Sequence, residues 1–389
     1  MKSFLRFSVV FFLIVPFFSK CQTPQTPLSY EEKKINNSGL EGSLKLEKIE
    51  WEINVNDTPV FRHFAVKNIG DETIFVYFNN ATKKLNLTSV LQHKLIKEID
   101  VNSIITKDNN LESVYFHNFD SIFLQQMYNI NLIDTCPTQA FKVPINQSKN
   151  PKMMLNNLGY GLPMIYDSLA NQLLLGQYSL RYAFYDKKYF RQNIEATFNL
   201  STQQFDETPF PYSKKYLEAY YGFAISAHRL VKDNYSIFTF QADPNIYVVN
   251  RCTGEVSVKA GKSAFHTAIQ EMSLKYKNDS NKKMAHLTLS PLYLELFWDK
   301  YRKLYYRFFL KEQPDCNPDG TYNAWRNKKK ILMVFNEDFT LLKEIELEDY
   351  LSHHYAFVAP QGFFIKADNS KQTNQNLKSI LFEVLKFEK

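Results

Sequence analysis

The chain has 389 residues, which is enough for two or three domains of average size or for one large repeat array. Hydrophobic residues make up 44% and charged residues 22%, so a disordered chain is excluded. Gly is scarce, at 11 residues, whereas 33 residues are Phe and 24 are Tyr, which excludes collagen-like and glycine-loop nucleotide-binding architectures as the main theme. The net charge of +7 is spread along the chain without a long basic block, and we expect no nucleic-acid partner.

The first twenty residues predict a signal peptide. Lys2 and Arg6 precede an apolar run over residues 7–18, shorter than the roughly 20 residues that span a bilayer. Cys21 follows, which resembles a bacterial lipoprotein processing site, although Lys20 stands where a small residue is usual. We therefore expect lipidation of Cys21 and a membrane-anchored envelope protein, periplasmic or at the outer membrane. Ordinary cleavage after Cys21 is the alternative, and it would give a secreted protein.

Residues 21–40 are polar, contain two prolines and show no periodicity, so they predict a tether. The remainder, residues 41–389, repeats a pattern of short apolar segments that end in polar turns. Residues 129–136 (NINLIDTC) match residues 245–252 (NIYVVNRC), and each is followed by a second apolar segment. No other apolar run in this body is long enough to span a membrane.

The repeat predicts an all-β fold, a six-bladed β-propeller of mostly four-stranded antiparallel blades. The second strand of each blade is expected near positions 75, 123, 174, 238, 306 and 364. In the fourth blade, we expect the first strand at residues 222–227. The segment 44–55 should pair with residues 380–387 and close the ring. Short helices are expected only within 211–219 and 264–273. Two β-sandwich domains are the alternative architecture.

One segment points to a known family. Residues 299–308 (DKYRKLYYRF), together with the lipoprotein-like start and six irregular blades, resemble the Bacteroidota propeller lipoproteins grouped as domain of unknown function 4221. The resemblance covers about residues 40–389. It implies a six-bladed propeller at the cell envelope, and it carries over neither an activity nor a catalytic residue.

Motifs for catalysis and metal binding are missing from the sequence. There is no phosphate-binding Gly-rich loop, no nucleophile elbow, no His-Glu-x-x-His, no regular calcium loop and no Cys-x-x-Cys pair. We expect neither a metal nor a cofactor. Arg307 would lie on a strand beside Tyr305, either in a sugar- or carboxylate-stacking site or in blade packing. We favour packing, with Arg307 bound to a backbone carbonyl or an acid.

Two groups of residues remain as candidate binding sites. His228, Arg229 and His354 lie at predicted strand ends, from which a propeller can bring side chains to its axis. The loop 317–330 carries Tyr322, Trp325 and Arg326, and Trp325 is expected to be exposed there as part of a recognition surface. The alternatives are ordinary hydrogen-bonded strand histidines and a merely solvated loop.

Two classes of function follow. The favoured one is a non-enzymatic, lipid-anchored module that binds a glycan, a peptide or a partner protein. The alternative is an envelope hydrolase or lyase with a site on the propeller axis, since the fold alone does not assign function. Several titratable side chains converging on the axis would favour the enzyme, whereas a plug of aromatic and aliphatic side chains would favour the binding module.

Overall fold

The structure is a computed structural model that describes residues 44–52, 63–105, 111–126, 129–136, 139–144, 153–155, 161–367 and 379–387. The predicted signal peptide and the whole predicted tether, including Cys21, lie outside the described residues. None of the described helices is long and apolar enough to span a membrane.

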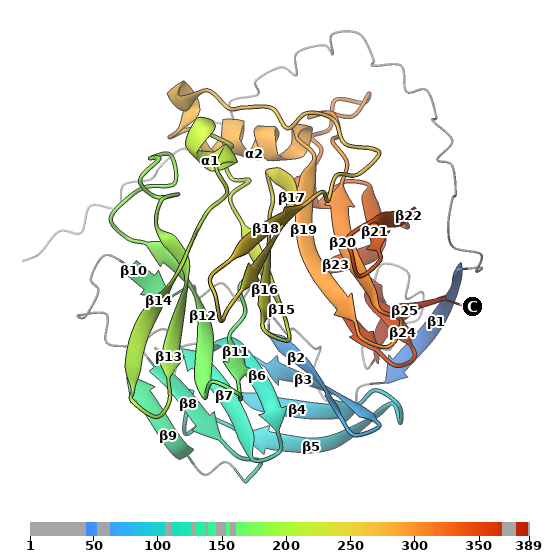
Figure 1. Cartoon of the computed structure of the whole chain (residues 1–389). Coiled ribbons are helices and arrows are strands. Elements are labelled where there is room, and N and C mark those ends of the chain that lie inside the picture. Colours follow the sequence, from blue (N-terminus) through green and yellow to red (C-terminus); the bar gives the residue numbers. More distant parts are fainter. Residues whose placement is uncertain are drawn as a thin grey trace, which may run out of the picture.

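Six antiparallel sheets form a ring, so the predicted six-bladed propeller is confirmed and the two-sandwich alternative is wrong (Figure 1). Blade one has, from the axis outward, the strands β2 (Phe64–Ile69), β3 (Glu72–Asn79), β4 (Lys84–Ser89) and β5 (Lys94–Asp100). Blade two has β6 (Leu111–Asn118), β7 (Ser121–Gln126), β8 (Asn129–Ile133) and β9 (Gln139–Pro144). Blade three has β10 (Met153–Leu155) with β11 (Ile165–Asp167), then β12 (Gln172–Ser179), β13 (Asn193–Asn199) and β14 (Gln204–Pro211). Blade three is irregular because β10 and β11 both pair with β12, which divides its innermost strand in two.

The last three blades each have four strands. Blade four has β15 (Ala227–Lys232), β16 (Tyr235–Phe240), β17 (Asp243–Asn250) and β18 (Val256–Lys259). Blade five has β19 (Leu292–Asp299), β20 (Leu304–Leu310), β21 (Lys330–Phe335) and β22 (Leu341–Leu347). Blade six has β23 (Leu351–Ala359), β24 (Gly362–Ala367), β25 (Ser379–Phe387) and β1 (Leu44–Glu52). All six predicted second strands are present, as β3, β7, β12, β16, β20 and β24.

Recurring Asn and Asp side chains make the turns between these strands. Each accepts a hydrogen bond from the backbone N–H two residues later, a local contact that ends a strand and starts a turn. The residues that do so are Asn79, Asn118, Asp134, Asp167, Asn199, Asn250, Asp299 and Asn336. This turn chemistry accounts for the repeat visible in the sequence.

The ring closes between its two ends, as predicted. Strand β1 pairs antiparallel with β25 over nine residues, from Leu44 opposite Phe387 to Glu52 opposite Ser379. Buried aromatic side chains then join blades six and one, with Phe75 packed 5.7 Å from Phe357 and 6.0 Å from Phe382 between ring centroids. A closed ring leaves no exposed sheet face between the first and last blades.

Buried arginines tie neighbouring blades together. Arg307 on β20 donates to the backbone carbonyls of Asp243, Pro244 and Gly261 in blade four, which confirms the predicted packing role for this residue. Its guanidinium also lies 4.4 Å from the ring centroid of Tyr293. These contacts satisfy a charged group that would otherwise be costly to bury.

Two predicted elements are misplaced. The first strand of blade four begins at Ala227 rather than at 222, because residues 221–224 form a turn closed by Ala224 N–H and Tyr221 C=O. Residues 264–273 form no helix, since tertiary contacts bind their backbone: Ala264 N–H donates to the Glu344 carboxylate and Met272 N–H to Tyr220 C=O. The helical elements are α1 (Lys215–Glu218), within a predicted range, with η1 (Leu274–Tyr276), α2 (Ser280–Leu289) and η2 (Trp325–Asn327).

Candidate functional site

The innermost strands of blades four, five and six begin at one end of the ring. We call it the helix end, because α1 and α2 lie there, next to the starts of β15 and β19 (Figure 1). Near these strand starts lie four titratable side chains, His228 on β15, Glu295 on β19, and His353 and His354 on β23. We call these four residues the axial cluster.

Direct contacts connect the members of the axial cluster. His228 Nδ1 lies 3.4 Å from Glu295 Oε1, so the cluster bridges blades four and five. The rings of His353 and His354 lie 3.9 Å apart between centroids, and His228 is close enough to His353 to influence its pKa. Three blades therefore contribute to one site.

Two β-bulges aim these side chains. The pairing of β19 with β20 shifts between Tyr293 and Leu296, and the pairing of β23 with β24 shifts between Ser352 and Ala356. Glu295 lies inside the first irregularity, and the two adjacent histidines lie inside the second. Because a bulge breaks the strict alternation of faces, it can turn side chains that would otherwise pack between blades toward a site.

The two buried histidines of the axial cluster are neutral at physiological pH. Burial lowers the pKa of His228 to about 3, and the nearby Arg307 guanidinium contributes to this shift. Burial also lowers the pKa of His353 well below its usual value, with a further contribution from His354. The opposite shift affects Glu295, because burial raises the pKa of its carboxyl. The site thus places a neutral imidazole beside a carboxyl whose pKa is raised by burial.

Several buried polar atoms of this site make no hydrogen bond to the described residues. Neither ring nitrogen of His228 or His353 has a hydrogen-bond partner there, and the same holds for Glu295 Oε2. Most buried side-chain polar atoms in proteins do have a partner. These five atoms therefore keep hydrogen-bonding capacity that the described residues do not use.

One aromatic side chain lies beside the axial cluster. Trp325 on η2 lies 6.1 Å from His354 and 6.5 Å from His353 between ring centroids. The expected exposure of Trp325 is wrong, because the indole is half-buried against the main hydrophobic core. Trp325 and His354, predicted in separate groups, are therefore parts of one site.

The other predicted residues lie elsewhere. Arg229 is buried and binds Glu195 and the carbonyl oxygens of Pro163 and Leu174, so its guanidinium ties blade four to blade three. Tyr322 is 61% exposed in the loop before η2, and Arg326 is exposed on η2 itself.

Sequence reasoning missed Glu295 and did not select His353. A signal was present for Glu295, since it is the single charged residue within the apolar segment 292–298 (LYLELFW). Among the residues that the structure describes, no group of three or more His, Cys, Asp or Glu side chains could hold a metal ion. The unpartnered donors and acceptors are what the axial cluster can offer a ligand.

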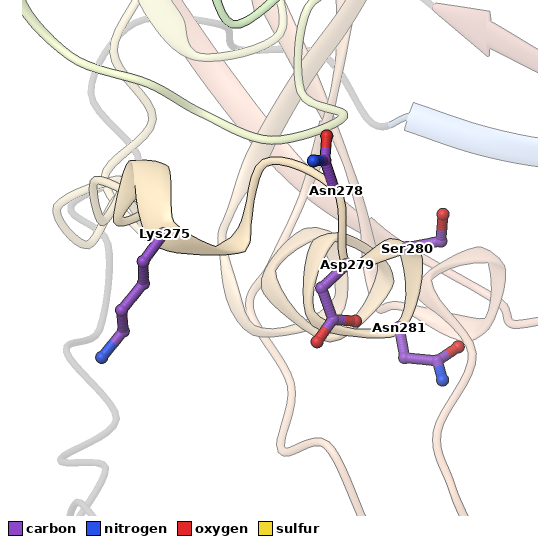
Figure 2. A pocket seen from close by; sticks show the side chains of 5 residues that line it. All are labelled: Lys275, Asn278, Asp279, Ser280 and Asn281. Carbon is purple, nitrogen blue, oxygen red and sulfur yellow. The ribbon is translucent and has the colours of Figure 1, made fainter.

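A hollow lies on the surface at the start of α2. It is lined by Lys275, Asn278, Asp279, Ser280 and Asn281 (Figure 2). Asp279 caps the helix, because its side chain accepts a hydrogen bond from Lys282 N–H. An anion approaching this helix terminus would meet a carboxylate, so we do not assign a site there.

Comparison with known proteins places this geometry in a family context. The family model described as domain of unknown function DUF4221 matches residues 43–346. The crystal structure of a DUF4221 member from Bacteroides vulgatus matches with a TM-score of 0.74 and 16% identity, over 89% of this chain and 98% of that chain. A predicted exported protein from Bacteroides fragilis matches with a TM-score of 0.55 and 11% identity, over 88% and 96%. At such identities the structural likeness shows the fold alone. The curated proteins gave no match.

Proposed function

The chain belongs to the DUF4221 family, and on that premise we propose that it is an extracytoplasmic binding module that holds a glycan at the axial cluster. The predicted signal peptide supports the location, as does the structural similarity to a predicted exported protein of Bacteroides fragilis. The unpartnered ring nitrogens of the buried His228 and His353 carry the proposal.

The chemistry of the cluster fits hydroxyl groups. A neutral imidazole donates with one nitrogen and accepts with the other, and a sugar hydroxyl also does both. A strongly charged ligand would gain less, because the two buried imidazoles carry no charge to pair with it. The half-buried face of Trp325 beside His354 suits the apolar face of a sugar ring.

Calorimetric titration tests the proposal with residues 22–389, which contain every described strand, helix and core cluster. We expect a class of neutral oligosaccharide to bind, and short peptides to give no heat. Trp325→Ala and His354→Ala should each weaken binding about tenfold, which corresponds to about 1.4 kcal/mol. Tyr322→Ala, in the same loop, is the matched control and should bind as the natural chain does.

Two outcomes would contradict this assignment. Binding that is lost in Tyr322→Ala but kept in Trp325→Ala would move the site from the axis to the exposed loop. Binding of peptides without any oligosaccharide would replace the glycan as ligand. Saturating ligand should also raise the melting temperature, since a hundredfold excess over Kd stabilises the folded state by about 2.7 kcal/mol.

A second candidate is an envelope hydrolase or lyase, the class that a convergence of titratable side chains on the axis favours, and it rests on the 3.4 Å contact between His228 and Glu295. The binding module comes first because the sequence carries no catalytic motif. A neutral imidazole next to a carboxyl of raised pKa is a general acid–base pair in reach of a bound substrate. Mass spectrometry of an incubated ligand would detect cleavage, and Glu295→Gln should keep binding while abolishing it. Ligand that stays intact after prolonged incubation would eliminate the enzyme and leave the binding module.

Membrane attachment is proposed to occur through a lipid on Cys21, as in the lipoproteins that the N-terminal segment resembles. Cys21→Ser should move the protein from the membrane fraction to the soluble fraction of fractionated cells. A variant that stays in the membrane fraction would contradict lipidation at this residue.

A further inference from the structure

A basic face occupies the rim of the helix end beside blade three. It is formed by the loop 180–192, between β12 and β13, and by the segment 271–282, which contains η1. Lys277 in the second segment lies over the ring of Tyr185 in the loop, so the two segments belong to one surface. They carry seven basic and three acidic side chains, a net of +4 from 25 residues, whereas the whole chain has +7.

Apolar side chains are exposed within this basic face. Leu180 is 51% exposed, Leu274 54% and Tyr185 36%. The face is hollowed where Leu274 and Lys277 meet the loop, and the loop lines the hollow with Tyr185, Asp186, Lys187, Lys188 and Arg191. The Asp186 carboxylate accepts a hydrogen bond from Lys188 N–H within the loop, and three basic side chains outnumber it there. Aliphatic side chains exposed among lysines suit a partner that is both apolar and anionic.

Tyrosine rings position the cations of the basic face. Lys277 Nζ lies 4.9 Å from the centroid of Tyr185, Lys275 Nζ 4.7 Å from that of Tyr276, and Lys188 Nζ 5.8 Å from that of Tyr182. Tyrosine beside lysine is also the combination found at the level of lipid headgroups, where the ring is amphipathic and the lysine stem lies along apolar surface.

We propose that the basic face docks on the surface of an anionic lipid bilayer. Leu180 and Leu274 enter the headgroup region, and the basic side chains around them meet lipid phosphates. An anionic polysaccharide would use the cations and tyrosines but would leave the two leucines exposed, which is why a bilayer fits better. Docking at the helix end turns the axial cluster toward the bilayer. This inference is independent of the proposed glycan binding.

Cosedimentation with vesicles tests the docking, with residues 22–389, so that no lipid anchor contributes. We expect the protein to bind vesicles of phosphatidylcholine with phosphatidylglycerol and not to bind vesicles of phosphatidylcholine alone. Binding should weaken as the salt concentration rises, because salt screens the attraction between the basic side chains and the lipid phosphates. Lys187→Glu/Lys188→Glu/Arg191→Glu should reduce binding at least tenfold, and Leu180→Ser/Leu274→Ser should reduce it as well.

The matched control is Lys94→Glu/Lys142→Glu/Lys259→Glu, which reverses three exposed lysines outside the basic face and changes the net charge equally. It should bind vesicles as the natural chain does. An equal loss of vesicle binding in both triple variants would overturn the proposal. It would also be overturned if the protein bound dextran sulfate, with or without the leucine changes, but did not bind vesicles. Glycan titration of the first triple variant should be unchanged, which separates this test from the test of the axial cluster.

Discussion

Replacing Arg307 by Ala tests what holds neighbouring blades together. The side chain is 0% exposed, and its guanidinium donates to three backbone carbonyls of blade four across the interface with blade five. In Arg307→Ala, the carbonyl oxygens of Asp243, Pro244 and Gly261 lose this donor, and the space above the Tyr293 ring is left unfilled.

The expected loss of unfolding free energy is about 3–5 kcal/mol. Hydrogen bonds to a charged group contribute about 1.5–3 kcal/mol each, and three are lost. The variant no longer has to desolvate a guanidinium, which offsets part of that sum and gives a value typical for removing one partner of a buried charged contact. A loss of this size is a large fraction of the roughly 5–15 kcal/mol that stabilises a typical folded protein.

Equilibrium urea denaturation, followed by tryptophan fluorescence, measures the change. Arg326→Ala, at an exposed arginine, is the control and should alter stability by less than about 0.5 kcal/mol. Arg307→Lys should be intermediate, because an ammonium keeps the charge but cannot reach all three carbonyls at once. An Arg307→Ala variant within about 1 kcal/mol of the natural chain would refute the idea that this arginine ties the blades together.

Three further predictions concern the same framework. Gly261→Ala should lower the melting temperature, since its Cβ would lie 2.6 Å from Pro244 O and 2.8 Å from Arg307 Nη1; an unchanged melting temperature would show that the interface yields. Stability should fall from pH 6.5 toward pH 3, because the unfolded state takes up a proton at the usual pKa of 6.5 whereas the pKa of His228 is about 3 in the folded state. This residue alone accounts for about 2 kcal/mol by pH 5, at about 1.4 kcal/mol per pH unit, and His228→Asn should show a shallower slope of unfolding free energy against pH. Deleting residues 44–52 should expose β25 as an edge strand, lower the melting temperature and promote aggregation. Adding a peptide of the deleted sequence should raise the melting temperature again and reduce aggregation. A deletion variant that melts like the natural chain would argue against closure by β1.

Local chemistry made the architecture readable from the sequence. An Asn or Asp that accepts a hydrogen bond from the second following backbone N–H marks a turn by itself, whatever the rest of the chain does. These turns, with the apolar segments between them, locate all six second strands and identify the partner of β1. The buried role of Arg307 could also be predicted, because an arginine inside an aromatic strand needs carbonyls or an acid once it is buried.

Non-local contacts decided the rest. The segment 264–273 is not helical because Glu344 and Tyr220 bind its backbone, and no propensity within the segment reports such partners. The axial cluster depends on the same kind of information. His228, Glu295 and His353 are separated by 125 residues of sequence, and they meet only because the ring places blades four to six side by side and two bulges turn the strands. The sequence by itself thus determined the strands, the turns and the closure of the ring, whereas the tertiary structure alone decided which side chains share the axis, since burial and convergence are properties of the closed ring.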